Sequence, residues 1–424
     1  MKGSSISAIH RLDRRVYLLG SAGLVRSIGR SATFVFLPLI FAEVYGLPYL
    51  AIGGLIAAIV PVSIISFLSG GYFSDRFGRR PFAVYPSFAS TVVLLFLWQY
   101  LDHGLAIVVG LWAINSFLGG LTRPAQSAMI GDVTPPDLTV TAFGVQRVFT
   151  NTGFAISPAI GGFLAATVGL PALFLFAAIT SVIEGTLLLV LLRETYPGHR
   201  PTPRERGEGV GAPFRDVPFV WLLVGMVGLA LVMNQFSTPL ALFLGSVRSL
   251  PLTEFGFIYS LNGVLVVLLQ LPISRWIEGR HQYLGWLAAG SITYGASFLL
   301  FDAAGSFAFY LLAMGVLTIG EDIVSPTQQT LVARFAGPEH RGSYFGAYNA
   351  ATNATRVVAP VVGTLLLGLG PSGSTWLWGG MFGISVAVAL GFLYLRGHAR
   401  RRIDSAGPQG PSPLPADLLL AGSD

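Results

Sequence analysis

Apolar and polar residues in this chain are arranged in long blocks, not in the short alternation of a surface helix or strand. Twelve apolar runs follow one another, each about 20 residues or longer, which suffices to cross a hydrocarbon layer roughly 30 Å thick. The pattern therefore predicts twelve membrane-spanning helices. They are expected near residues 16–41, 50–72, 82–100, 104–129, 139–166, 171–192, 217–245, 254–274, 284–302, 305–333, 342–368 and 374–395.

One polar interruption is much longer than the others. Residues 193–216 are rich in proline, glycine and charge, and they separate two sets of six spans. We expect this segment to be a cytoplasmic linker between two six-helix bundles at 16–192 and 217–395. Residues 1–15 are expected to be a cytoplasmic segment, and the proline-, glycine- and serine-rich residues 396–424 a disordered cytoplasmic tail.

The two halves repeat. Pro124 and Pro326, Gln126 and Gln328, and Pro158 and Pro360 are each separated by 202 residues, without a gap. Such a repeat indicates an internal duplication of the six-span unit. The predicted fold class is therefore an all-α polytopic membrane protein of two pseudo-symmetric bundles.

Composition excludes an ordinary soluble domain. The 424 residues are 53% apolar and 11% charged, whereas soluble domains carry about 25% charged residues. The net charge of +6 comes from short turns and tails, so we expect lipids as partners and no nucleic acid. Basic residues concentrate in the turns on one side, while the opposite turns hold only Arg248. The positive-inside rule then places both termini in the cytoplasm, and we expect a cell-membrane location.

A charged motif lies between the second and third spans. It consists of Gly71, Asp75, Arg76, Gly78, Arg79 and Arg80. Arginines alone would fix the turn on one side of the membrane, so a topological role leaves the acid unexplained. The motif resembles the loop signature of the major facilitator superfamily, and the chain resembles its twelve-helix drug-efflux branch. The resemblance implies secondary transport by alternating access, and a conformational latch in which Asp75 docks against the other half near the eleventh helix.

A second motif lies in the fifth span: Gly153, Ser157, Pro158, Gly161 and Gly162. It resembles the family's export-associated motif, with Ser157 in place of a glycine, and the alternative is plain packing of small residues. In the fourth span, Asn115 stands where the family's proton-coupled drug antiporters have an arginine. That difference argues against proton–drug antiport.

Charged residues also lie inside the spans. Each arginine at mid-membrane costs about 2.5–3.5 kcal/mol on insertion scales, so these residues should face protein or water. The resemblance implies a central cavity lined by helices one, four, seven and ten, which places near it Arg26, Arg30, Asn115, Arg123, Asn234, Gln235, Glu321 and Asp322. Further interior charges are Arg147, Glu184 and Arg356.

Two interpretations of these charges remain open. In the first, they form static ion pairs that hold the helices together. In the second, Glu321 or Asp322 exchanges a proton, or pairs with Arg26 or Arg30 in one state only, because adjacent carboxylates in a low dielectric resist joint ionisation. A surplus of cavity arginines also points to an anionic or zwitterionic substrate.

The sequence lacks the marks of an enzyme. The six histidines lie outside the spans without metal-ligand spacing, and neither a phosphate-binding glycine loop nor a nucleophile elbow occurs. We expect no enzyme activity, no cofactor and no metal, and a monomeric chain. The expected function is export of a small amphipathic compound, with exchange for protons left open. The alternatives are a carrier for an organic anion or a lipid-like molecule, and a non-transporting membrane sensor of the same fold.

Overall fold

The computed structural model describes residues 10–135, 138–195, 212–280 and 282–405, and within them not the side chains of residues 140, 212, 337–342 and 398–405. Twelve helices of the described part are long and apolar enough to cross a membrane, which confirms the predicted all-α fold with twelve spans. The first six are α2 (Arg14–Glu43), α3 (Tyr49–Phe77), α4 (Arg79–Tyr100), α5 (Leu105–Asp132), α6 (Thr139–Thr167) and α7 (Ala172–Leu191).

The second half begins with the short helix α8 (Ala212–Arg215). It continues with α9 (Val217–Met233), the 3-10 turn η2 (Asn234–Phe236), α10 (Thr238–Leu242) and the π-helical segment η3 (Phe243–Val247), which together form one span. The remaining helices are α11 (Leu252–Glu278), α12 (Tyr283–Ala303), α13 (Phe307–Leu367) and α14 (Gly373–Ser405). Helix α13 holds two spans, Phe307–Ala336 and Ser343–Leu367, and its backbone stays helical between them.

The seventh span is broken near its middle, where the sequence predicted one continuous helix. Pro239 has no amide N–H to donate to the preceding turn, so the regular helix cannot pass through it unchanged. Two buried tyrosines bond carbonyls around the break: Tyr259 donates to the Phe236 carbonyl at 2.9 Å, and Tyr294 donates to the Met233 carbonyl at 3.3 Å. The break is therefore stabilised by neighbouring helices.

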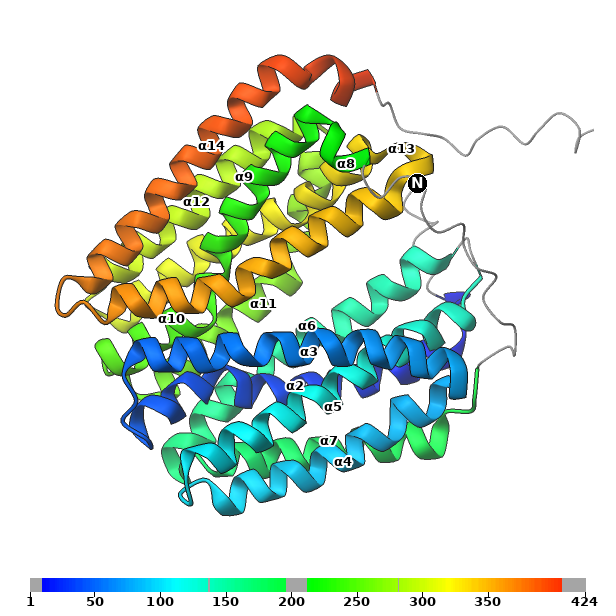
Figure 1. Cartoon of the computed structure of the whole chain (residues 1–424), viewed down its shortest axis with the longest axis vertical. Coiled ribbons are helices and arrows are strands. Elements are labelled where there is room, and N and C mark those ends of the chain that lie inside the picture. The colour runs from blue at the N-terminus through cyan, green and yellow to red at the C-terminus, as the bar shows by residue number, and fades with distance from the viewer. Residues whose placement is uncertain (1–9, 136–137, 196–211, 281, 406–424) are drawn as a thin grey trace, which may run out of the picture.

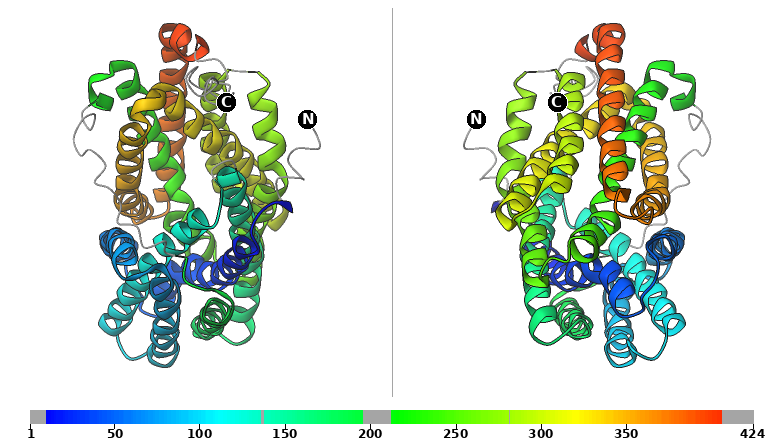
Figure 2. Two further views of the ribbon diagram at one scale, coloured as in Figure 1. Left: turned by 90° about the vertical axis from the view of Figure 1, so that its right-hand side faces the viewer. Right: turned by 90° about the vertical axis from the view of Figure 1, so that its left-hand side faces the viewer.

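The spans form two bundles that meet at one end of the molecule and diverge at the other (Figure 1). Helices α2 to α7 form one bundle and α9 to α14 the other, and the views along the side of the molecule show the same division (Figure 2). Across the boundary between them, α6 packs against α11 and α3 packs against α13.

Hydrophobic packing explains why only one end is closed. The largest cluster of buried apolar residues takes members from both bundles, among them Phe36, Phe41 and Ile52 from the first and Leu244, Phe255 and Trp378 from the second. Two smaller clusters, around Val16 in the first bundle and around Phe219 in the second, each stay within one bundle. These two lie toward the ends of the helices nearest the chain termini.

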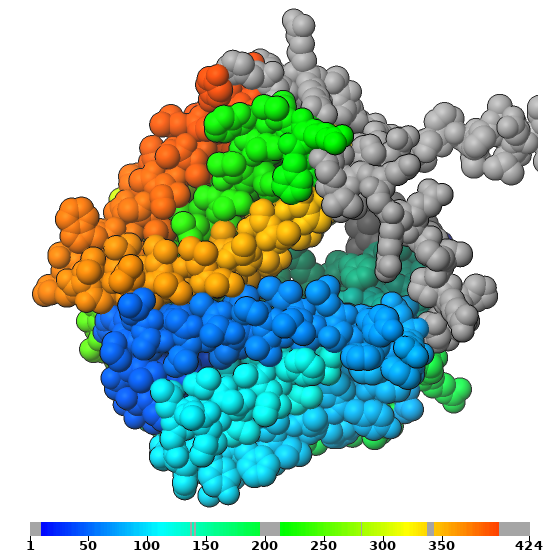
Figure 3. Space-filling view, viewed as in Figure 1, coloured from blue at the N-terminus to red at the C-terminus, as the bar shows by residue number. Residues whose placement is uncertain are grey.

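The bundles are therefore joined by apolar burial far from the termini and separated near them. A space-filling view shows the resulting hollow between α13 and the first bundle at the end that carries the termini (Figure 3).

Small residues let the two bundles touch backbone to backbone. A Cβ atom added to Gly162 would lie 2.3 Å from the carbonyl oxygen of Leu252, and one added to Gly256 would lie 2.3 Å from the carbonyl oxygen of Pro158. Both contacts join α6 to α11. No side chain larger than hydrogen fits between the helices at these positions.

Candidate functional site

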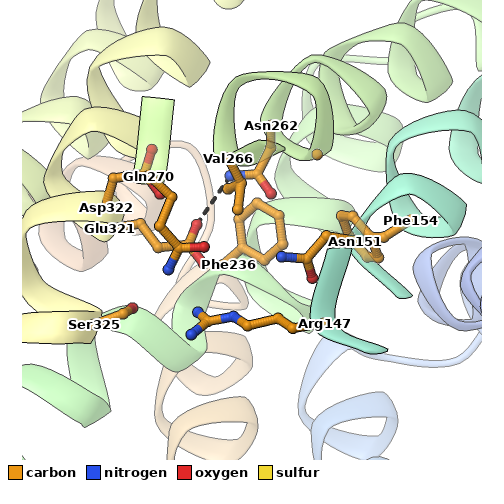
Figure 4. A pocket seen from close by; sticks show the side chains of 11 residues that line it. Arg147, Asn151, Phe154, Phe236, Asn262, Val266, Gln270, Glu321, Asp322 and Ser325 are labelled. Atoms are coloured by element: carbon orange, nitrogen blue, oxygen red, sulfur yellow. Dashed lines mark hydrogen bonds between the residues drawn. The ribbon is translucent and has the colours of Figure 1, made fainter. Parts of the chain in front are cut away.

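A polar cavity of about 280 Å³ lies between the two bundles. Helix α6 lines one side of it, and helices α11 and α13 line the other (Figure 4). The lining residues are Arg147, Asn151, Phe154, Phe236, Asn262, Gly263, Val266, Gln270, Glu321, Asp322 and Ser325. Because the walls belong to different bundles, any rocking of one bundle against the other changes the shape of this cavity.

Helical periodicity brings these side chains together. Arg147, Asn151 and Phe154 are spaced i, i+4 and i+7 on α6, and Asn262, Val266 and Gln270 are spaced i, i+4 and i+8 on α11, so each set occupies one helix face. Of these, only Arg147 is among the residues named from the sequence. Asn262 and Gln270 were missed, although two amide side chains inside an apolar span were an available signal.

The two acids in the cavity differ in their surroundings. The amide of Asn262 donates to Glu321 Oε2 at 3.0 Å and to Thr318 Oγ1 at 3.0 Å. Asp322 is 1% exposed, and neither of its carboxylate oxygens has a hydrogen-bond partner among the described residues. An ionised carboxylate in such a place is costly, and a proton or a cationic ligand relieves that cost.

The cation that faces this acid pair is Arg147. Its guanidinium points across the cavity toward the acids from the opposite bundle (Figure 4) and acts on both carboxylates electrostatically. No hydrogen bond or ion pair of the Arg147 side chain occurs within the part of the chain that the structure describes. The attraction between the bundles at this point is therefore long-range and sensitive to the charge on the acids.

Arg26 has a different partner from the one considered from the sequence. It donates to Gln126 Oε1 at 2.6 Å and lies 3.3 Å from Glu184 Oε1, and Gln126 donates to the same Glu184 oxygen at 2.9 Å. These three residues, the Arg26–Gln126–Glu184 triad, join α2, α5 and α7 within the first bundle. In this structure Arg26 thus pairs with Glu184, and Glu321 and Asp322 face Arg147.

The triad predicts a stability effect. Glu184→Gln should destabilise the protein by about 3 kcal/mol, because removal of one member of a buried pair leaves the other charge uncompensated. Replacing Arg26 and Glu184 together by glutamine should restore part of the loss. The thermal midpoint of the purified protein measures this, with Asp75→Asn as control; the Asp75 side chain is 45% exposed, and its loss is expected to cost no more than about 1 kcal/mol. An equal loss of thermal stability in Glu184→Gln and in the control Asp75→Asn would contradict a buried pair of Arg26 and Glu184.

The other predicted cavity residues occupy two environments. Asn234 Nδ2 donates to Thr355 Oγ1 at 2.9 Å, which ties the broken seventh span to α13, and Gln235 is fully buried. Asn115 is half-buried. Arg30, Arg123 and Arg356 are exposed side chains on α2, α5 and α13.

The charged motif between α3 and α4 contacts residues of its own bundle. Arg79 lies 3.0 Å from Asp75 Oδ1 and also pairs with Asp132 on α5. Arg80 donates to the carbonyls of Leu192 and Leu189 at the end of α7. Asp75 therefore faces Arg79 while the bundles are apart at this end, and its docking near the eleventh helix stays a prediction for another state.

Other residues of this motif shape the turn. Gly78 has φ +97°, a conformation that side-chain-bearing residues rarely adopt. Glu194 accepts from the backbone N–H groups of Arg79 and Arg80 at 3.1 and 3.0 Å. Arg76 donates to the Tyr72 hydroxyl at 3.2 Å, and a Cβ added to Gly71 would lie 4.0 Å from the Pro124 Cβ on α5.

The fifth-span motif packs on both sides of α6. Ser157 Oγ donates to the Ile28 carbonyl on α2, and a Cβ on Gly153 or Gly161 would also crowd α2. On the opposite side, Pro158 and Gly162 meet α11 in the other bundle. The backbone N–H of Ala159 donates to Ser260 Oγ on α11 at 2.8 Å. The motif thus forms a close backbone contact between the bundles.

Two six-helix bundles around a polar cavity define a membrane transporter. The chain belongs to the Major Facilitator Superfamily, whose family profile matches residues 19–360 and 286–421. It is a multi-pass membrane protein and a secondary transporter rather than an enzyme.

Relatives of this family include antiporters and resistance proteins. The chain is 29% identical over 395 residues to a Na(+), Li(+), K(+)/H(+) antiporter of Planococcus maritimus, covering 85% of this chain and 90% of that protein. It is 27% identical over 332 residues to multidrug resistance protein 1 of Bacillus subtilis, covering 74% and 80%. A crystal structure of a POT family transporter in complex with a thioalcohol-conjugated peptide shares the fold, with a TM-score of 0.74, 14% identity and coverage of 94% and 100%.

Proposed function

We propose that this transporter exports a small amphipathic compound across the cell membrane in exchange for protons, as a monomer with both termini in the cytoplasm. The observation that carries the proposal is the cavity between the bundles, in which the buried Asp322 has no hydrogen-bond partner among the described residues. The lining of this cavity combines the carboxylate of Asp322 with the apolar side chains of Phe154, Phe236 and Val266. Such a lining fits a molecule with an apolar body and a polar group.

Coupling follows from the way the charges are divided between the bundles. Glu321 and Asp322 belong to α13, and Arg147 belongs to α6. When the acids are ionised, they attract Arg147 and favour one arrangement of the bundles. When a proton neutralises one of them, the attraction weakens and the other arrangement gains population. In this proposal the acids of α13 carry the proton, without the fourth-span arginine that Asn115 replaces. A proton and the transported compound can thus alternate in one cavity.

The direction of transport is supported by two features. The fifth-span motif around Pro158 resembles the motif associated with export in this family, with Ser157 in place of a glycine, and its Gly162 lies in a close contact between the bundles. Relatives of the chain include a multidrug resistance protein. We therefore propose efflux rather than uptake.

Monovalent cation/proton antiport is a second candidate. It is favoured by the two carboxylate oxygens of Asp322, which have no hydrogen-bond partner within the described part of the chain, and by similarity over 85% of the chain to a Na(+), Li(+), K(+)/H(+) antiporter. A carboxylate that binds either a proton or a metal cation would exchange the two directly.

Proteoliposomes with an imposed pH gradient and an internal pH dye separate the two candidates. The test compounds are an aromatic quaternary ammonium ion, an aromatic sulfonate and a neutral aromatic amide, none of which takes up or releases a proton itself. We expect proton movement when a compound of this panel is transported. NaCl and KCl, tested at the same ionic strength, should cause none. Proton movement on addition of the salts alone would support cation antiport, and no movement with any addition would contradict proton coupling.

A further inference from the structure

Three arginines outside the acid-lined cavity converge from both bundles. Arg30 on α2 and Arg123 on α5 belong to the first bundle, and Arg356 on α13 belongs to the second. All three side chains are exposed, although their helices pack inside the molecule, and their guanidinium groups lie within electrostatic range of one another. Exposed groups from two bundles that act on one another must face the space between the bundles.

These charges are not compensated by acids. Within the described residues, the side chains of Arg30, Arg123 and Arg356 make no ion pair and no hydrogen bond. The nearby Arg26 adds a further positive charge to the group, and its acid partner Glu184 is already occupied by the triad. Charges inside a membrane protein normally pair or line a path for ligands. The three arginines therefore lack the static partners that a purely structural role requires.

We propose that Arg30, Arg123 and Arg356 form an anion-binding site in the space between the bundles, which receives the carboxylate, sulfonate or phosphate group of the transported compound. Guanidinium groups suit this task because their planar donors match such oxygens in pairs. The inference rests on the proposed function and narrows the substrate class to amphipathic compounds with an anionic group.

The site also bears on the transport cycle. Arg356 approaches Arg30 and Arg123 from the opposite bundle, so like charges oppose closure of the open end, and closure would also remove the water that now solvates them. An anion that bridges the arginines removes both penalties. Binding of the anionic group should therefore favour closure of the open end.

Binding to the purified full-length protein in neutral detergent tests the site without any gradient. The probes are an aromatic sulfonate, the matching uncharged sulfonamide and inorganic sulfate, followed by thermal unfolding at constant ionic strength. We expect the sulfonate to raise the thermal midpoint, sulfate to compete with it and the sulfonamide to have no effect. Arg30→Gln, Arg123→Gln and Arg356→Gln should each weaken sulfonate binding about tenfold or more.

Two control variants keep the result interpretable. Arg280→Gln removes an arginine that stacks on Trp276 at the end of α11, away from this group, and should leave sulfonate binding unchanged. Arg30→Lys keeps the charge but loses the paired planar donors, so it should bind the sulfonate more weakly than the wild type and more tightly than Arg30→Gln. It also provides a test at this position if Arg30→Gln fails to fold. Equal binding of the sulfonamide, no binding of the sulfonate, or unchanged affinity in all three glutamine variants would overturn the site.

A separate experiment distinguishes a lipid headgroup from the transported compound as the source of the anionic group. Phosphatidylglycerol and phosphatidylcholine are added in separate mixed micelles with the sulfonate. If phosphatidylglycerol displaces the sulfonate and sulfate does not compete, the arginines hold a lipid headgroup, and the assignment to the substrate is overturned. This experiment measures binding and no transport. A failure to bind the sulfonate would therefore overturn the anion site without deciding whether the protein exports a compound in exchange for protons.

Discussion

Asp322→Asn is expected to abolish proton-driven transport, with flux reduced by about 100-fold or more, the loss seen when a proton-transferring side chain is removed. Asparagine has nearly the same volume, but it neither ionises nor takes up a proton. The attraction to Arg147 across the cavity would then no longer depend on pH. Initial rates of gradient-driven flux in proteoliposomes, measured for the wild type and the variant, check the effect.

Two variants on the same helix serve as controls. Glu321→Gln should cost less, because its amide oxygen can still accept the bond that Asn262 now donates to Glu321. Ser325→Ala changes the same cavity wall without altering charge and should leave coupling intact. In Asp322→Asn, exchange of substrate without a gradient should survive and become independent of pH. Gradient-driven flux at the wild-type rate in this variant would eliminate Asp322 as the proton site.

A disulfide between cysteines at positions 53 and 364 is expected to stop transport completely. Gly53 lies on α3 and Thr364 on α13, and a Cβ added to Gly53 would lie 3.0 Å from the Thr364 Cβ, so a small adjustment gives the separation of about 3.8 Å found in disulfides. The bond would join the bundles at their closed end and prevent that end from opening. The native chain contains no cysteine, so the introduced pair has no competing thiols.

The matched control joins two helices of one bundle. Gly29 on α2 and Thr180 on α7 show the same 3.0 Å separation between an added Cβ and the threonine Cβ. A disulfide formed from Gly29→Cys and Thr180→Cys should leave transport largely unchanged, because the two helices move as one body. Flux is measured after oxidation and again after reduction. Full activity of the oxidised 53–364 pair would argue against rocking of the bundles.

The sequence predicted the membrane spans well because the bilayer requires about 20 mainly apolar residues in each span, and a single polar residue does not hide this pattern. It did not predict the break in the seventh span, since Pro239 is tolerated within transmembrane helices and only neighbours such as Tyr259 determine where the backbone departs from the helix. It also treated the spans in α13 as separate helices, although the backbone remains helical between them.

Pairing of the interior charges was beyond the sequence. Spacing shows which residues share a helix face, but the rotation of each helix about its axis is set by packing against the others. Arg26 and Glu184 are 158 residues apart, and their contact depends on the relative placement of α2 and α7. For the same reason, the sequence named Arg147 among the interior charges without showing that it faces Glu321 and Asp322.

The glycine contact between α6 and α11 has a mechanical consequence. At Gly162 and Gly256 the facing surfaces consist of main-chain atoms, without interlocking side chains that would have to change rotamer when the helices tilt. The two helices can therefore tilt about this crossing without rearranging side chains, and the contact can persist while the bundles move. Bulkier residues at Gly162 or Gly256 would push α6 and α11 apart and hinder their tilting.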